Sequence, residues 1–444
     1  MPAPIELVTD LLQKARAAGA DAADAVFAEG IALAHSQRMG NIDKLERSEG
    51  QDLGLRVFVG QRQAIVSTTD LSASSLDQLA GRAVAMARAV PEDEFAGIAD
   101  PDQLATEFPD LDLAADDEPT PEVLIARARA AEEAALAVDG ITNSEGAEAD
   151  WSRSSITLAA SNGFVGGYAV SRHSVSVVPL AGEGTAMERD YDYDIAVYAE
   201  DLEDPAEIGR RAAARTLARL NARKVATTRV PVVFDKRVAG SLIGHLASAI
   251  NGAAVARGTS FLKDKMGEPV FAAGLSIIDD PHRPRGLASK PFDGEGIANR
   301  KREIVADGRL ATWLLDLRSA RQLGLETTGH ASRGTSAPPS PSSTNLYLPA
   351  GETTPEELMR AVGTGFLVRE LIGFGVNTVT GDYSRGASGH WIENGEPAYP
   401  VSEVTIAGNL TDMFMHISPA DDLEFRRGTN APTLRVDGMT VAGA

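Results

Sequence analysis

A glycine-rich run that leads into a β-hairpin constrains the fold of this chain more than any other feature. The run covers 375–410, and its glycines are interleaved with polar side chains. Residues 390–393 predict a strand, Asn394-Gly395 a two-residue turn and 399–407 the returning strand, because the turn needs a positive φ that Asn tolerates and Gly readily adopts. A glycine-rich approach that carries polar groups to a rigid sheet is a common way to build a site. The alternative is a wide loop that uses glycine only for turns.

Composition limits the classes of protein to which the chain can belong. With 444 residues it has room for about three domains of about 150 residues each. Its 42 Lys and Arg against 63 Asp and Glu give a net charge of −21. Such a surface repels nucleic-acid phosphates and anionic lipid, so we expect no nucleic-acid partner. The chain has no cysteine, which excludes disulfides, thiolate zinc sites and cysteine nucleophiles.

Targeting and membrane signals are absent from the sequence. The N-terminus has no basic region followed by an apolar stretch, so it does not resemble a signal peptide. The longest apolar stretch, 238–256, contains serine, histidine, asparagine and glycine, which argues against a membrane span. We therefore expect a cytoplasmic protein with no membrane partner.

Hydrophobic periodicity predicts an α+β protein in which helix-flanked sheets precede a mostly β C-terminal domain. We expect an N-terminal α+β domain at 1–90, an acidic linker at 91–121, a second α+β domain at 122–226 and the β-rich domain at 227–444. The expected helices are 5–18, a helix after Asp70 that ends near Val90, 122–138, 205–224 and a small-residue helix at 237–254. The expected strands before residue 240 are 24–27, 31–37, 44–49, 53–59, 63–67, 154–160, 164–178, 189–198 and 230–234.

Two segments do not fit regular structure. Residues 91–121 hold 11 acids, five prolines and no Lys or Arg, which predicts a solvated linker, with an acidic docking tail as the alternative. Residues 327–345 form a long loop rich in Ser, Thr, Pro and Gly, and loops of this length are often functional or disordered.

Local catalytic and ligand-binding motifs are missing. No two of the seven histidines are closer than 26 residues, which excludes His-x₃-His and His-Glu-x-x-His clusters. Phosphate-binding glycine loops and a Gly-x-Ser-x-Gly elbow are also absent. A metal held by scattered carboxylates stays open. We expect His245, which lies among small residues, to be a hydrogen-bonded core or interface histidine.

Four stretches together resemble one known family. They are the strand and helix that precede Arg257-Gly-Thr-Ser260, the segment Thr335-Ser-Ala-Pro-Pro-Ser-Pro341, and the blocks 381–387 and 400–410. They resemble the TldD/PmbA family, and more closely its PmbA (TldE) branch, over nearly the whole chain. The resemblance implies a heterodimeric metallopeptidase that processes peptides or partly unfolded small proteins.

The resemblance also places the zinc motif of the catalytic TldD-type subunits. That motif, His-Glu-x-x-x-His, lies on the helix before Arg-Gly-Thr-Ser, and its positions correspond here to Ile243, Gly244 and Ser248. None of these residues can bind zinc, and Gly244 cannot act as a general base. The resemblance therefore implies a subunit without catalytic residues, metal or cofactor, with zinc in a TldD-like partner. The small-residue helix also allows a homodimer when the chain is alone.

The same resemblance suggests which residues line a shared substrate chamber. The candidates are Arg257, Thr259, Gly381, Asp382, Tyr383, Ser384, Arg385 and His390, together with the loop 327–345. An exposed sheet edge could pair with the peptide backbone. For Arg257 and Thr259, a plain helix exit is the alternative to a polar corner that faces a cleft.

Two other functions stay open. Asp382, Ser384 and His390 could supply a nucleophile and a base for an independent hydrolase. The family's historical name, modulator of gyrase, instead suggests a regulator of a DNA enzyme, and a chain of charge −21 would act there through protein.

Overall fold

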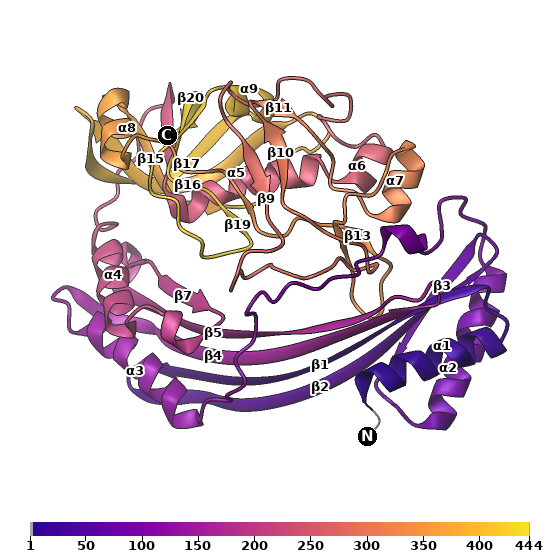
Figure 1. Ribbon diagram of the computed structural model, residues 1–444. Coiled ribbons are helices and arrows are strands. Elements are labelled where there is room, and N and C mark those ends of the chain that lie inside the picture. Colours follow the sequence, from indigo (N-terminus) through magenta and orange to yellow (C-terminus); the bar gives the residue numbers. More distant parts are fainter. Residues whose placement is uncertain (1–2, 444) are drawn as a thin grey trace.

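The largest element of the computed structural model, which describes residues 3–443, is a long antiparallel sheet from the N-terminal half of the chain (Figure 1). The strand order is β3-β2-β1-β4-β5-β6, and β7 also pairs with β5. The strands are β1 (Ala22–Arg38), β2 (Asn41–Val59), β3 (Arg62–Thr68), β4 (Ile141–Ala160), β5 (Val165–Ala181), β6 (Glu188–Arg189) and β7 (Asp192–Ala196).

Strands β1 and β2 are longer than predicted. Each joins two expected strands, 24–27 with 31–37 and 44–49 with 53–59, so the expected breaks are wrong. At the first break Gly30 lies opposite Gly50 on one side and Ser154 on the other. Pairing on both sides keeps this glycine extended, although glycine by itself weakens a strand.

Four helices cover the sheet in two pairs (Figure 1). Helices α1 (Pro4–Ala17) and α2 (Ala73–Ala89) pack with β1–β3 around one core, which includes Leu11 and Leu55. Helices α3 (Pro121–Leu136) and α4 (Pro205–Leu217) pack with β4 and β5 around a second core, which includes Leu124 and Ile208. The predicted ranges 1–90 and 122–226 thus share one sheet but have separate cores, and their boundaries as domains stay a prediction.

The acidic segment 91–121 packs between the long sheet and the C-terminal part. The side chains of Leu111 and Leu113 are buried. Leu111 accepts a hydrogen bond from the backbone N–H of Arg285 at 2.8 Å, and Asp112 pairs with the guanidinium of Arg285 at 2.7 Å. The segment is therefore a packed strap, and the expectation that it is solvated throughout is wrong.

The C-terminal part closes its main strands into a ring. The order is β17-β16-β15-β8-β20-β18, and β17 pairs in addition with β20. All pairs are antiparallel except β8 with β15. The strands are β8 (Thr228–Phe234), β15 (Gly365–Ile372), β16 (Asp382–Glu393), β17 (Glu396–Asn409), β18 (Ile417–Pro419) and β20 (Leu434–Ala442).

Short elements complete this part of the chain. Strands β11, β10, β9, β14 and β19 form a second sheet in that order, and β12 pairs with β13. The strands are β9 (Ile277–Asp279), β10 (Arg302–Ala306), β11 (Arg309–Leu310), β12 (Ala331–Ser332), β13 (Ser340–Pro341), β14 (Leu346–Tyr347) and β19 (Thr429–Asn430). The helices are α5 (Lys236–Ala249), α6 (Gly252–Ala256), α7 (Leu317–Leu323), α8 (Pro355–Val362) and α9 (Leu410–Met415).

The α+β fold class and the hairpin at Asn394-Gly395 are confirmed. Asn394 has φ 53° and Gly395 has φ 81°, as the two-residue turn requires. The single helix expected at 237–254 is wrong, because the chain leaves the helical path after Ile250 and restarts as α6. The side chain of Asn251 accepts hydrogen bonds from the backbone of Ala253 and Ala254 and so caps the second helix.

Other predicted elements also differ from the structure. The strand expected at 154–160 begins at Ile141, and the strand expected at 390–393 begins at Asp382. The strand expected at 189–198 is split into β6 and β7. The helix expected at 205–224 ends at Leu217. The loop 327–345 carries the two-residue strands β12 and β13, which pair with each other and place the loop against the long sheet.

Buried charges join the C-terminal part to the long sheet. Asp24 on β1 accepts hydrogen bonds from Arg56 on β2, at 2.5 and 2.9 Å, and pairs with Arg333 of the loop 327–345. Glu295 lies 3.7 Å from Arg56 and accepts a hydrogen bond from the backbone of Leu317 at 2.9 Å. All four side chains are buried, so the charged Asp24, Arg56 and Arg333 depend on one another to offset the loss of hydration, whereas Glu295 keeps its proton at pH 7.

No helix among residues 3–443 is both long enough and apolar enough to cross a membrane.

We expect Gly54→Ala to destabilise the protein by about 1–3 kcal/mol, because a Cβ on Gly54 would overlap the carbonyl oxygen of Thr335 and one backbone would have to move. Gly50→Ala, on the same strand with open space around its Cβ, is the matched control and should cost much less. Urea unfolding measures both variants. Equal losses would contradict a contact specific to Gly54.

Glu295 predicts a pH dependence of stability. Burial raises the pKa of this carboxyl from 4.5 to about 8, with the nearby Arg56 opposing the rise. Between these two pKa values Glu295 keeps its proton in the folded state but ionises in the unfolded chain. The stabilisation that this proton gives the folded state is therefore complete below pH 4.5 and is lost as the pH rises through 8.

We expect Glu295→Gln to flatten the fall of the unfolding free energy between pH 5.5 and 7.5 by up to about 1.4 kcal/mol per pH unit. Urea unfolding at several pH values measures the slope. Glu303→Gln, at an exposed position on β10, is the control that should keep the wild-type slope. A wild-type slope in Glu295→Gln as well would show that Glu295 is ionised in the folded protein.

Candidate functional site

The candidate site lies where helix α5 crosses strand β16 of the ring. Strand β8 leads directly into α5, and the side chain of Asp235 caps the helix by accepting a hydrogen bond from the backbone of Arg237 at 3.0 Å. Leu242 and Leu246 are fully buried in the core that α5 shares with the ring. The opposite face of α5 is left for polar or functional groups.

The three positions that correspond to a zinc motif do not converge on a metal site. Ile243 is fully buried in the core. Gly244 has no side chain, and a Cβ added to it would meet open space. Ser248 is exposed, and its hydroxyl donates to the backbone oxygen of Gly244 at 3.0 Å. Zinc is normally held by histidine, cysteine or carboxylate ligands, so these side chains do not fit it.

The rest of the described chain offers no alternative ligand set. Among residues 3–443, no group of three or more His, Asp or Glu side chains is arranged to hold an ion.

Strand β16 divides the glycine-rich candidates between its two faces. Tyr383 is buried in the core with α5, and Arg385 lies on the same side because strand side chains alternate. Asp382 and Ser384 are exposed on the other side. The sequence predicts a strand only at 390–393 and a glycine-rich approach before it, whereas β16 already begins at Asp382, and the alternation of side chains turns only half of these candidates toward the helix.

Three polar side chains meet between α5 and β16. The ring of His245 lies edge-on to that of Tyr383, with centroids 5.9 Å apart, and the charge of Arg385 acts on both. His245 Nε2, the Tyr383 hydroxyl and Arg385 Nε are buried, and none has a hydrogen-bond partner within residues 3–443. Buried polar atoms without partners are uncommon in folded proteins and point to function or strain.

The electrostatics of this trio keep it positively charged overall. Burial, assisted by Arg385, lowers the pKa of His245 to about 4, so the imidazole is neutral at pH 7. Burial raises the pKa of Tyr383, so its hydroxyl keeps its proton. One guanidinium and two neutral groups can attract an anionic or carbonyl oxygen, but they form no nucleophile with an adjacent base.

The expectation that His245 is hydrogen-bonded is wrong for its Nε2 atom. The small neighbours of His245 in the sequence indicated close packing but not the contact with Tyr383. That contact depends on the crossing of α5 and β16, which joins positions 138 residues apart.

Arg257, Thr259, Asp382 and Ser384 form an exposed rim beside this trio, whereas Gly381 and His390 are buried. The backbone of Phe261, after Arg257 and Thr259, donates to Thr378 at 2.9 Å, so the Arg-Gly-Thr-Ser corner lies against the glycine-rich approach. Both Arg257 and Thr259 are exposed. Gly381 has φ 80°, a conformation that glycine adopts without strain.

Asp382 belongs to the same rim. It accepts hydrogen bonds from the Thr380 hydroxyl at 2.7 Å and from the Asn409 amide at 3.2 Å. These two bonds lower the pKa of Asp382, so its carboxylate is ionised at neutral pH.

Ser384 and His390 do not form a catalytic pair. They are six residues apart on one strand, which corresponds to about 20 Å at about 3.3 Å per residue. His390 Nε2 lies 3.0 Å from the carbonyl oxygen of Ala218, and burial lowers the pKa of its ring to about 4. The alternative of an independent hydrolase built on Asp382, Ser384 and His390 therefore lacks its geometry.

Known protein families match this chain along its length. Three consecutive family profiles cover it: PmbA/TldA metallopeptidase domain 1 at residues 23–87, the central domain at 115–220 and the C-terminal domain at 227–443. The metalloprotease PmbA of Escherichia coli O157:H7 is 40% identical over 425 residues, covering 95% of this chain and 92% of that protein. A PmbA homologue of Haemophilus influenzae is 38% identical, covering 99% and 96%.

Solved structures agree on the fold. A crystal structure of a candidate modulator of DNA gyrase from Bacteroides thetaiotaomicron has a TM-score of 0.91 and 28% identity, covering 99% of this chain and 98% of that one. TldE from Thermococcus kodakarensis has a TM-score of 0.89 at 19% identity, covering 98% and 100%. At that identity the second likeness supports the fold alone.

We expect Tyr383→Phe to leave the unfolding free energy unchanged or to raise it by about 1 kcal/mol, because the lost hydroxyl has no partner within residues 3–443. Tyr198→Phe is the control, since the Tyr198 hydroxyl donates to Asp112 and to the backbone of Ala114. The control should lose about 1 kcal/mol in urea unfolding. A similar loss in Tyr383→Phe would place the Tyr383 hydroxyl in the structural hydrogen-bond network.

Proposed function

Because this chain belongs to the PmbA/TldD metallopeptidase family, we propose that it is the non-catalytic, PmbA/TldE-like subunit of a heterodimeric peptidase. Its TldD-like partner would hold the zinc and cleave peptides or partly unfolded small proteins. One observation carries this proposal. The fold of the family is present, yet Ile243, Gly244 and Ser248 offer no zinc ligand and no general base.

The subunit would help to hold an extended peptide next to the partner's active site. A free sheet edge supports this role. Strand β2 pairs with β1 along its whole length, whereas β3 pairs with β2 only from Leu53 onward, so within residues 3–443 the outer edge of 41–52 has no strand partner. Extended peptides commonly bind such an edge through backbone hydrogen bonds.

The polar trio at α5 and β16 would supply a second contact. Arg385, with the hydroxyl of Tyr383 beside it, suits a carbonyl or carboxylate oxygen of the peptide. The ionised Asp382 and the exposed Arg257 on the adjacent rim suit charged peptide groups. In this role the subunit binds and orients the peptide, and bond cleavage belongs to the partner.

An apolar tip next to the trio suits contact with the partner. Phe374 is 101% exposed between two glycines, and Ile372 and Val379 nearby are 59% and 54% exposed. Adjacent exposed apolar side chains of this size are typical of protein–protein contacts. We propose that this tip contacts the TldD-like subunit. A homodimer of the isolated chain and a cytoplasmic location are further parts of the proposal.

The test is reconstitution. We expect the purified chain alone to hold no stoichiometric zinc and to cleave no peptide, and its addition to a TldD-like subunit to raise peptide cleavage above that of the subunit alone. Zinc content is measured by elemental analysis and cleavage with a fluorogenic peptide. A mixture no more active than the TldD-like subunit by itself, or tightly bound zinc in the lone chain, contradicts the proposal.

Phe374→Ser tests the contact surface. We expect it to weaken association with the TldD-like subunit about tenfold or more, as for an aromatic residue central to an interface, and to reduce the stimulation in parallel. Ile5→Ser, at an exposed apolar position on α1, is the matched control and should leave both unchanged. Analytical ultracentrifugation of the mixtures measures association.

A further inference from the structure

A small cavity lined mainly by cations lies between α4 and the start of α5. Its volume is about 120 Å³. The cationic lining consists of Arg211, Arg215, Lys236, Arg237, Arg426 and Arg427, whereas only Asp192 and Glu424 contribute carboxylates. Six cations against two acids are notable in a chain whose net charge is −21.

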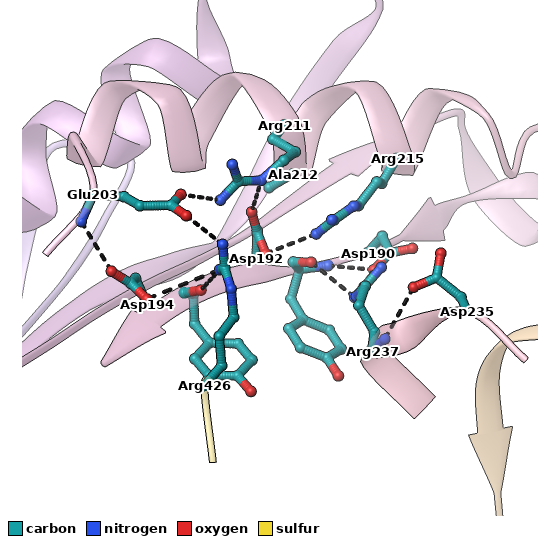
Figure 2. Close-up of polar contacts among 12 residues, drawn as sticks. Asp190, Asp192, Asp194, Glu203, Arg211, Ala212, Arg215, Asp235, Arg237 and Arg426 are labelled. Atoms are coloured by element: carbon teal, nitrogen blue, oxygen red, sulfur yellow. Dashed lines mark hydrogen bonds and ion pairs between the residues drawn. The ribbon is translucent and has the colours of Figure 1, made fainter. Parts of the chain in front are cut away.

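Other acids of this network pair with the guanidinium groups without lining the cavity (Figure 2). Asp190 accepts a hydrogen bond from Arg237 Nη2 at 2.8 Å, and Glu203 accepts one from Arg211 Nη2 at 2.5 Å. Neither acid lines the cavity. The network as a whole is balanced in charge, but its positive groups face the cavity and most of its counter-charges do not.

Several donors of these arginines remain free. A guanidinium has five N–H donors in a fixed fork. Within residues 3–443, Arg237 Nη1 is buried without a hydrogen-bond partner. Arg211 binds Asp192 and Glu203 through Nε and Nη2, and Arg427 donates from Nε to the Tyr193 hydroxyl at 2.5 Å. The known contacts therefore do not use the full donor capacity around the cavity.

We propose that this cavity binds a compact tetrahedral oxyanion of the phosphate or sulfate type. Its cations come from α4, α5 and the segment before β19, so they surround the cavity from several directions. A tetrahedral ion accepts hydrogen bonds in several directions, whereas a carboxylate accepts them near one plane. The volume exceeds the space of about 15 Å³ that one water needs.

The bound anion would link the helix layer of the long sheet to the C-terminal ring. Free phosphate and the phosphoryl group of a larger molecule share this chemistry, and the experiment separates them. The inference does not depend on the proposed peptidase role, because the test uses the full-length chain without a partner.

The test is titration of the full-length chain by isothermal calorimetry with inorganic phosphate at constant ionic strength, with chloride as the reference anion. We expect saturable binding of one phosphate. We expect Arg427→Met to weaken it about tenfold or more, because two or more charge-assisted hydrogen bonds are lost. This change leaves no carboxylate unpaired, since the hydrogen-bond partner of Arg427 is the Tyr193 hydroxyl.

The matched control is Arg210→Met. Arg210 is the neighbour of Arg211 on α4 but pairs with Glu207 and does not line the cavity, so phosphate affinity should stay within about twofold of wild type. Arg211→Met is a second lining variant that should weaken binding as Arg427→Met does. Thermal unfolding without phosphate confirms that each variant is folded.

The outcomes separate the possible ligands. If O-phosphoserine binds with the affinity of phosphate, the site is assigned to a phosphoryl group of a larger molecule. If O-phosphoserine does not bind, the site is assigned to the free ion. The proposal is overturned if titration with phosphate releases the same heat as titration with chloride. It is also overturned if Arg210→Met and Arg427→Met lose phosphate affinity equally. Acetate that binds as tightly as phosphate overturns the assignment to a tetrahedral ion.

Discussion

The close approach of two backbones, which only glycine permits, sets how the halves of this molecule fit together. At Gly54 the carbonyl oxygen of Thr335 occupies the space that a side chain would need. The loop 327–345 can therefore reach the sheet, and it carries Arg333 to Asp24. A buried carboxylate paired with two arginines is stable only when all three side chains are together. The contact of Arg333 with Asp24 and the packing of the ring against the sheet therefore depend on each other.

The site at α5 and β16 lies on a helix that its packed face holds in place. Helix α5 is anchored by a buried face that includes Leu242, Leu246 and Ile243. Gly244, which has no side chain, and the exposed Ser248 contribute little to that anchoring. The side chains at these two positions can therefore vary without loss of the fold, because most of the stability of a protein helix comes from its packed face.

Local signals gave the elements of this fold, whereas their contacts depended on distant parts of the chain. The Asn394-Gly395 hairpin and helix 5–18 follow from turn chemistry and periodicity, and both are present. The sequence predicts a strand break at Gly30, because the low strand preference of glycine does not reveal that this residue pairs with a strand on each side. The meeting of His245 with Tyr383 and the basic cavity at α4 likewise combine residues with no relation in the sequence.

Net charge and local charge lead to different conclusions here. The total of −21 argues against binding to long anionic polymers, whose many phosphates would meet the acidic surface. Exposed charges are screened within about 8 Å at physiological ionic strength, so a single small anion responds mainly to the groups around it. The cavity is lined by six cations and by the two carboxylates of Asp192 and Glu424, whereas Asp190 and Glu203 pair with its arginines from outside the lining. An acidic surface disfavours extended polyanions, whereas a local excess of arginines would favour one compact ion.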